Sequence, residues 1–149
     1  MPEVKRIQTL DLNDLRDLIA ESRQEGFHFL QRLTDDFVQG HNRFDRLGEA
    51  LFGLYNNQTL IGIGGLNLDP YRDDDWIGRV RHLYIARQWR RCGLGKLLMR
   101  AILDEARKQF HLLTLRTDTQ DAAAFYEALG FQRAAPDTND SHFISLEGE

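Results

Sequence analysis

The stretch that decides the fold is Arg90-Arg91-Cys92-Gly93-Leu94-Gly95-Lys96. It joins a strand-like run that ends at Ile85 to the most regular amphipathic helix pattern in the chain, which opens at Gly93. The first amides of a helix have no internal acceptor, and the helix dipole adds partial positive charge there. Two glycines leave room for a bulky anion and three basic side chains add full charge, so the stretch predicts a phosphate site.

Two well-known phosphate loops do not fit this stretch. The pattern Gly-x-x-x-x-Gly-Lys-Ser/Thr is absent, and the pattern Gly-x-Gly-x-x-Gly would need a third glycine where Leu98 stands. A glycine pair that merely closes a loop is the remaining alternative. The succession of a strand, a basic loop and a helix favours the anion site over this alternative.

The distribution of charge supports a local anionic ligand. The chain has 19 basic and 23 acidic residues and a net charge of −4. Seven of the bases nevertheless lie between residues 79 and 100, a stretch without Asp or Glu: Arg79, Arg81, Arg87, Arg90, Arg91, Lys96 and Arg100. One basic segment in an acidic chain favours a small polyanion over nucleic acid, which would need a broad basic face.

Periodicity on either side of the loop predicts the other elements. Helices are expected over residues 11–26, 29–38, 93–109 and 121–129, and strands over 4–10, 50–55, 60–66, 76–85, 112–117, 131–133 and 142–146. This order predicts an α/β fold, a mixed sheet with helices on both faces, in a single domain of residues 1–149. Strands 76–85 and 112–117 should be parallel, joined by a right-handed crossover through the helix between them.

Composition excludes several other classes of protein. The single cysteine, Cys92, excludes an intramolecular disulfide and a multi-cysteine metal site, and His28 and His142 lack metal-ligand spacing, so no metal is expected. No apolar run approaches the roughly 20 residues of a membrane span, and the first residues lack the apolar core of a secretion signal. We therefore expect a cytoplasmic protein without a membrane partner.

A second motif lies about 30 residues beyond the glycine loop, at Ala122-Ala123-Ala124-Phe125-Tyr126-Glu127-Ala128-Leu129-Gly130-Phe131. With the loop, it resembles the GNAT superfamily of N-acetyltransferases, whose two motifs read Arg/Gln-x-x-Gly-x-Gly/Ala and Ala-x-x-x-Tyr-Glu-x-Leu-Gly-Phe. The order of the predicted elements also agrees, so the resemblance covers most of the chain. It implies a mixed, mostly antiparallel central sheet flanked by helices, with two parallel strands that splay apart at the centre.

The resemblance also implies where acetyl-CoA binds. The backbone at the end of strand 76–85, beside a β-bulge, would bind the pantetheine arm, and the amides of residues 91–96 would hold the pyrophosphate. The family often has an asparagine before the last long helix, where Asp118 and Thr119 stand in this chain. The implied coenzyme-binding residues are Leu83, Tyr84, Ile85, Arg90, Arg91, Cys92, Gly93, Leu94, Gly95, Lys96, Thr119 and Phe125.

For catalysis, the resemblance implies that the Tyr126 hydroxyl protonates the departing thiolate. Packing of Tyr126 on one helix face is the structural alternative. The glutamate that acts as base in some members aligns with Arg79, which cannot be a base. His82 is the nearest titratable group of suitable pKa, although strand alternation places it away from the face of Arg79, Arg81 and Leu83, and a structural role is equally open.

The predicted reaction is direct transfer of the acetyl group to a primary amine on a small molecule or peptide. Helices 11–39 and loops 69–75 and 135–141 should select the acceptor, and the acidic run at residues 73–75 either attracts a cationic amine or is a solvated loop. A covalent acyl-Cys92 is the weaker alternative to direct transfer. A non-catalytic acyl-CoA-binding module and an unrelated nucleotide-binding domain stay open, as does the oligomeric state, with a homodimer among the alternatives.

Overall fold

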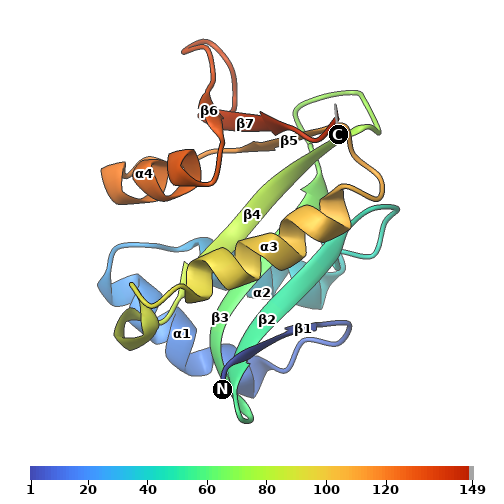
Figure 1. Ribbon diagram of the computed structural model, residues 1–149. Coiled ribbons are helices and arrows are strands. Elements are labelled where there is room, and N and C mark those ends of the chain that lie inside the picture. Colours follow the sequence, from blue (N-terminus) through green and yellow to red (C-terminus); the bar gives the residue numbers. More distant parts are fainter. Residues whose placement is uncertain (148–149) are drawn as a thin grey trace.

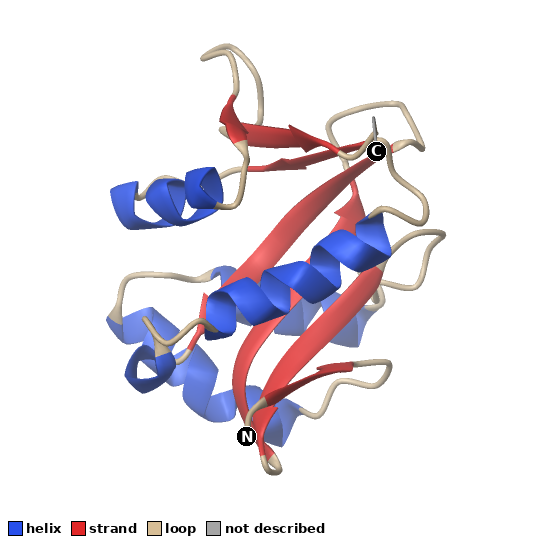
Figure 2. Ribbon diagram, viewed as in Figure 1, coloured by secondary structure: helices blue, strands red, loops and turns tan. Residues whose placement is uncertain are grey.

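The computed structural model describes residues 1–147 and shows one seven-stranded sheet with helices on both faces (Figure 1, Figure 2). The last two residues of the expected domain, 148–149, lie outside the described residues. The sheet order is β1-β2-β3-β4-β5-β7-β6. The strands are β1 (Glu3–Arg6), β2 (Ala50–Asn56), β3 (Thr59–Leu68), β4 (Ile77–Ile85), β5 (Leu112–Leu115), β6 (Gln132–Arg133) and β7 (His142–Ser145).

Four helices and one 3₁₀ turn connect the strands. They are α1 (Leu12–Gln24), α2 (Phe29–Gln39), a 3₁₀ helix (Arg87–Trp89), α3 (Leu94–Ala106) and α4 (Gln120–Ala128). The predicted element order is confirmed, and the boundaries differ by only a few residues. The largest differences are at the first strand, which ends at Arg6 and not at residue 10, and at α3, which ends at Ala106 and not at residue 109.

The helix ends follow local chemistry that the sequence predicts. The Asp11 carboxylate accepts a hydrogen bond from the Asn13 amide and caps α1. Gly40 ends α2 in the left-handed conformation, at φ 81°. Because these caps are set by neighbours in the chain, both helices begin and end close to where the pattern placed them.

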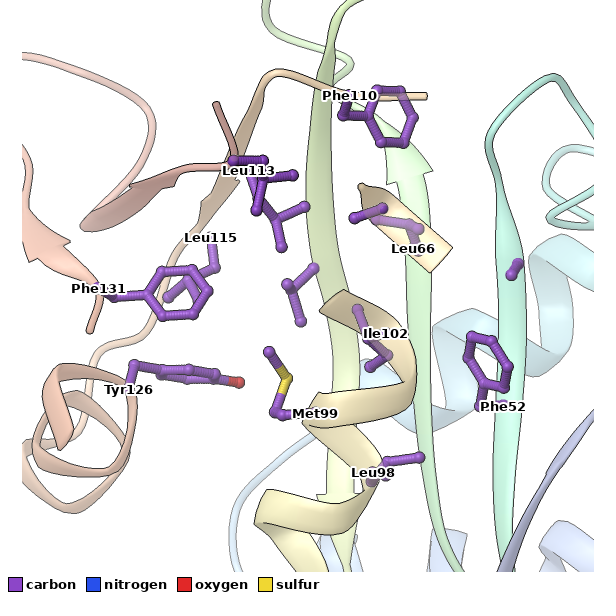
Figure 3. Close-up of a cluster of buried hydrophobic side chains, with 14 residues drawn as sticks. Phe52, Leu66, Leu98, Met99, Ile102, Phe110, Leu113, Leu115, Tyr126 and Phe131 are labelled. Carbon is purple, nitrogen blue, oxygen red and sulfur yellow. The ribbon is translucent and has the colours of Figure 1, made fainter. Parts of the chain in front are cut away.

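The two faces of the sheet carry separate apolar cores. α1 and α2 cover one face, where Leu15, Leu30 and Leu33 are buried against β2, β3 and the end of β4. α3 and α4 cover the other face, and Figure 3 shows Leu98, Met99 and Ile102 of α3 beside Phe131 and Leu113 in this second core. β3 lies between the two cores, so its residues are buried on both sides.

Within residues 1–147, β4 and β5 form the one parallel pair, as the crossover through α3 requires. Their ladder is short: Ile77 pairs with Leu112, Gly78 with Leu113 and Arg79 with Thr114. Figure 1 shows the two strands fanning apart beyond this point, β4 toward the start of α3 and β5 toward α4. The splayed parallel pair implied by the resemblance is therefore present.

Candidate functional site

The second half of β4 has an open edge. β5 pairs with residues 77–79 only, and residues 80–85 have β3 as a neighbour on one side and no strand of the described chain, residues 1–147, on the other. Backbone N–H and C=O groups on an unpaired strand edge are ready to bind an extended ligand. Leu83, Tyr84 and Ile85 lie on this edge, where the sequence placed the pantetheine arm.

A β-bulge interrupts β4 beside that edge. Ile63 of β3 lies opposite Tyr84 and Gly65 lies opposite Arg81, so two steps along β3 match three steps along β4. His82 is the extra residue of the bulge. Its φ of 60° is a left-handed conformation that is uncommon for a residue with a side chain. The bulge breaks the alternation of β4, because Val80 packs in the α3 core whereas the His82 ring lies near Phe29 of α2.

The loop before α3 presents a row of unbonded amides. Arg91 and Gly93 have φ values of 64° and 82°, and Gly93 is the N-cap of α3 without a side-chain capping bond. The first amide of this region to find an acceptor is Leu97, which donates to the Gly93 carbonyl at 3.1 Å. The six amides of residues 91–96 donate to no acceptor in residues 1–147. Left-handed residues that alternate with extended or helical ones turn successive amides toward one side, which makes an anion-binding concavity.

The side chains of this loop fall into two groups. Arg91, Cys92 and Lys96 are exposed, and neither cation forms an ion pair within the described part of the chain. The Cys92 thiol donates a hydrogen bond to the Trp89 carbonyl at 2.8 Å, so this side chain makes a contact within the loop. Arg91 and Lys96 are therefore free to approach phosphate groups.

Arg90 belongs to the second group, because its guanidinium is already occupied. Its Nε donates to the Ile85 carbonyl at 2.8 Å, and its terminal nitrogens donate to both oxygens of Glu25 at 2.7 and 3.0 Å. The guanidinium also lies 5.1 Å from the centre of the Tyr84 ring. Arg90 thus ties the loop to the end of β4 and to α1, and its contacts are those of a positioning residue.

Sequence reasoning missed Glu25 and its neighbour Glu21. The bonds from Arg90, with further bonds from Tyr84 and Arg87, lower the pKa of Glu25 to about 2 despite its partial burial. Glu21 accepts from the Arg87 amide at 3.0 Å and lies 2.6 Å from the Tyr84 hydroxyl. Glu21 and Glu25 are four residues apart, so their negative charges repel each other. This spacing was the sequence signal that basic residues from elsewhere in the chain pair with them.

Gly95 and Phe125 bring the two motifs together. A Cβ at Gly95 would lie 3.2 Å from two carbon atoms of the Phe125 ring, so a methyl group there would press on the ring. At Gly93 the same atom would meet nothing within 4 Å. The first glycine is thus required by its φ and the second by the close approach of α4 to α3.

Tyr126 points from α4 into the α3-side core. The residue is buried, with 7% of its surface exposed, and Figure 3 shows its hydroxyl directed toward Met99. The hydroxyl makes no hydrogen bond to any of residues 1–147, and burial raises the pKa of Tyr126 well above its usual range. The phenol therefore stays protonated at neutral pH and has a free donor beside the diverging strands.

His82 is a weaker base than its type predicts. Its two ring nitrogens are buried and have no hydrogen-bond partner in the described residues, and the ring centre lies 6.3 Å from that of Phe29 and 6.2 Å from that of Phe44. Burial, followed by the charges of Arg81 and Arg32, lowers the pKa of His82 to about 3, against a smaller opposing effect of the Phe29 carbonyl. Unbroken alternation would put Val80 and His82 on one face, and the bulge separates them.

The remaining predicted residues have structural contacts. Thr119 caps α4, because its hydroxyl oxygen accepts from the Ala122 amide at 3.2 Å, and Asp118 is exposed. Arg79 is buried, donates to the Asn139 carbonyl at 3.0 Å and lies 3.7 Å from the Asp69 carboxylate. The acidic run 73–75 precedes β4, at the opposite end of this strand from the Gly93 loop (Figure 1).

The described residues contain no candidate for a membrane span or for a metal site. No helix within residues 1–147 is both long enough and apolar enough to cross a membrane. In the same range, no three side chains of the types His, Cys, Asp or Glu are grouped so that they could hold a metal ion.

Comparison with known proteins agrees with this geometry. The family model described as the Acetyltransferase (GNAT) family matches residues 12–131. A protein of Exiguobacterium sp. 255-15, provisionally described as an acetyltransferase, is 27% identical over 97% of this chain and 93% of its own, with a TM-score of 0.86. One of Klebsiella pneumoniae, provisionally described as an acyl-CoA N-acyltransferase, is 25% identical over 99% of both chains, with a TM-score of 0.67.

A GNAT-family acetyltransferase of Staphylococcus aureus Mu50 shares the fold at 17% identity, with a TM-score of 0.75 over 97% of this chain and 100% of its own. The α/β architecture is thus shared with these solved structures. The chain belongs to the GNAT acetyltransferase family. The family supports an acyltransferase activity for this protein.

Proposed function

We propose that this protein transfers the acetyl group of acetyl-CoA to a primary amine by direct attack of the amine on the thioester. One observation carries the donor half of this proposal: the six consecutive amides from Arg91 to Lys96, at the N-terminus of α3, have no acceptor within residues 1–147. The coenzyme is a polyanion with a long polar arm. The amide row suits its pyrophosphate, and the open edge of β4 suits its pantetheine arm.

The residues of the loop fit this ligand. The left-handed Gly93 lets the amides turn outward, and Gly95 leaves room where a Cβ would contact Phe125. Arg91 and Lys96 add charge from unpaired side chains, and Arg90 holds the loop against Glu25. In this proposal Arg90 positions the amides, whereas Arg91 and Lys96 contact phosphate.

Bound acetyl-CoA supplies the activated acetyl group as a thioester. The enzyme contributes position and orientation for the amine, and an amide at the β4 bulge polarises the thioester carbonyl. The Tyr126 hydroxyl donates a hydrogen bond to the sulfur as the thiolate departs. With its raised pKa, Tyr126 stabilises the thiolate mainly through this bond and transfers its proton less readily.

The acceptor amine must lose a proton before or during the attack. Arg79 cannot take the proton, and His82, with a pKa of about 3, is a weak base. We propose that the amine is deprotonated by solvent, which lets the reaction speed up as the pH approaches the pKa of the amine. The small-molecule or peptide acceptor and the cytoplasmic location remain predictions.

The proposal is tested by thiol release from acetyl-CoA with a panel of primary amines, alongside calorimetric titration of the protein with acetyl-CoA. We expect saturable binding and amine-dependent release. The lack of an acidic residue at Arg79 favours a second candidate, a non-catalytic acyl-CoA-binding module. Tight binding without release on any amine would establish that second candidate, and the absence of binding would reject both.

A further inference from the structure

The α2-facing side of the β4 bulge has an unusual collection of side chains. Val80 packs in the α3 core, so Arg81, the next residue, points to the opposite face. His82 lies on that opposite face too, because the bulge gives two successive residues the same side and its ring lies near Phe29 of α2 and Phe44. The cationic side chain of Arg81 and the imidazole of His82 thus lie side by side on the part of β4 that has an open edge.

α2 adds a second cation to the same place. Arg32 is one helical turn beyond Phe29, and its charge and that of Arg81 both act on the His82 ring. The carboxylates one turn further along α2 have other partners, since Asp35 accepts from Gln31 and Asp36 lies near His41. The charges that act on His82 are therefore both positive.

Neither arginine has a partner among the described residues. The side chains of Arg32 and Arg81 form no ion pair and donate no hydrogen bond within residues 1–147, whereas Arg79, two residues before Arg81, is bonded to Asn139. The two ring nitrogens of His82 are buried and have no hydrogen-bond partner within residues 1–147. Buried polar groups are normally bonded, so the ring needs an explanation, whereas Arg32 is exposed and Arg81 is partly exposed to solvent. A bound ligand would satisfy all three side chains together.

We propose that the acceptor of this enzyme is a small amine that also bears an anionic group, a carboxylate or a phosphate, which Arg81 and Arg32 bind. This inference rests on the proposed acetyl transfer, since it places the acceptor amine at the bulge. Because Arg81 is next to the bulge, the amine and the anion of the acceptor lie only a few bonds apart. The neutral His82 ring accepts or donates one hydrogen bond to the same molecule.

The test compares acceptors in matched pairs with the amine held constant. One arm uses amino acids and their amides, and the other uses an amino sugar phosphate and the free amino sugar, each assayed above the pKa of its amine. We expect the anionic member of at least one pair to have a kcat/KM at least about 10-fold higher, as charged hydrogen bonds would give. The arm that shows the difference identifies carboxylate or phosphate as the anion.

Variants assign the difference to the two arginines. Arg81→Gln and Arg32→Gln should each raise the KM of the anionic acceptor by about 10-fold or more, leave that of its neutral partner unchanged and leave acetyl-CoA affinity unchanged. Arg81→Lys should restore part of the preference because it keeps the charge. Arg107→Gln, which removes the same charge at an exposed site on α3, is the matched control and should change nothing.

The inference and the proposed function can fail separately. Equal or better use of the neutral members, or a preference that survives both glutamine variants, overturns the inference while acetyl transfer stands. If no amine releases thiol, the binding of the same acceptor pairs to the coenzyme-loaded protein is measured by calorimetry. An anion preference that Arg81→Gln abolishes then supports the inference without catalysis, and equal binding of both members overturns it.

Discussion

The two ends of β4 differ in how far their polar groups find partners within the chain. At the first end, Arg79 and Asp69 are buried, Thr114 donates to Asp69 at 2.7 Å, and Asn139 accepts from Arg79. At the other end, six amides and the cations of Arg91 and Lys96 have no partner in residues 1–147. One strand therefore has a bonded, buried polar cluster where it pairs with β5 and leaves polar groups available to a ligand where it does not.

The largest expected effect tests the paired end. Asp69→Ala leaves the buried Arg79 without its carboxylate. It also removes the shorter of the two hydrogen bonds of the Thr114 hydroxyl, whose other acceptor is the Gly78 carbonyl at 3.3 Å. We expect the free energy of unfolding, measured with urea, to fall by about 3–5 kcal/mol. Asp104→Ala is the control, because Asp104 is an exposed partner of Arg107, and it should cost less than about 1 kcal/mol. A similarly small loss for Asp69→Ala would mean that this end of β4 is not a stabilising cluster.

The next effect tests the open end. Gly93→Asp puts a negative charge beside the unpaired amides and should weaken acetyl-CoA binding by about 100-fold or more while the protein stays folded. Gly93→Asn is the matched control, since asparagine has nearly the same size and tolerates the left-handed conformation without the charge. Calorimetry should find the asparagine variant much closer to the wild type. Equal losses in both variants would point to shape instead of charge.

A smaller effect is expected at Tyr126, which α4 places in the α3-side core. Tyr126→Phe removes a hydroxyl with no partner among residues 1–147, so stability should hardly change. Because its raised pKa limits it to hydrogen bonding, we expect kcat to fall by about 10-fold, below the range of full acid catalysis. Acetyl-CoA affinity should stay within about 2-fold of the wild type. Unchanged kcat would remove Tyr126 from the mechanism and leave it as a core residue.

The smallest effect concerns Glu25, whose pKa falls from 4.5 to about 2 in the folded protein. A lowered folded pKa stabilises the protein above the unfolded pKa, and this stabilisation is lost as the pH falls from about 4.5 toward about 2. Unfolding measured across that window should therefore depend less on pH in Glu25→Gln than in the wild type. The partial exposure of the group keeps the difference modest. Identical pH dependence would show that the Glu25–Arg90 bond contributes nothing.

The sequence predicted what local chemistry determines. The start of α3 at the glycine loop, the extents of α1 and α2 and the apolar stripe of α3 depend on residues within one or two turns of each other, and the structure has them within a few residues of the prediction. The crossover rule gave the parallel pair from element order alone. The family motifs added the divergence of that pair and the bulge beside it.

What the sequence did not predict depends on contacts between distant segments. Arg90 and Glu25 are 65 residues apart in the sequence. No local pattern predicts that the Arg90 guanidinium pairs with Glu25, at the end of α1, and not with a phosphate. The bulge at His82 moved the ring to the α2 side, where burial and two arginines lower its pKa. Both outcomes follow from tertiary packing, which cannot be predicted from the alternation of residues along a strand.

The bond between Glu25 and Arg90 has one more consequence. Glu25 follows the last turn of α1, which covers one face of the sheet, and Arg90 stands before the helix that covers the other. A ligand that shifts α1 and a ligand that shifts the loop therefore act on the same bond from two sides of the molecule. By equilibrium linkage, whatever change in loop affinity a ligand on α1 produces through this bond is matched by an equal change in the affinity of that ligand when the loop is occupied.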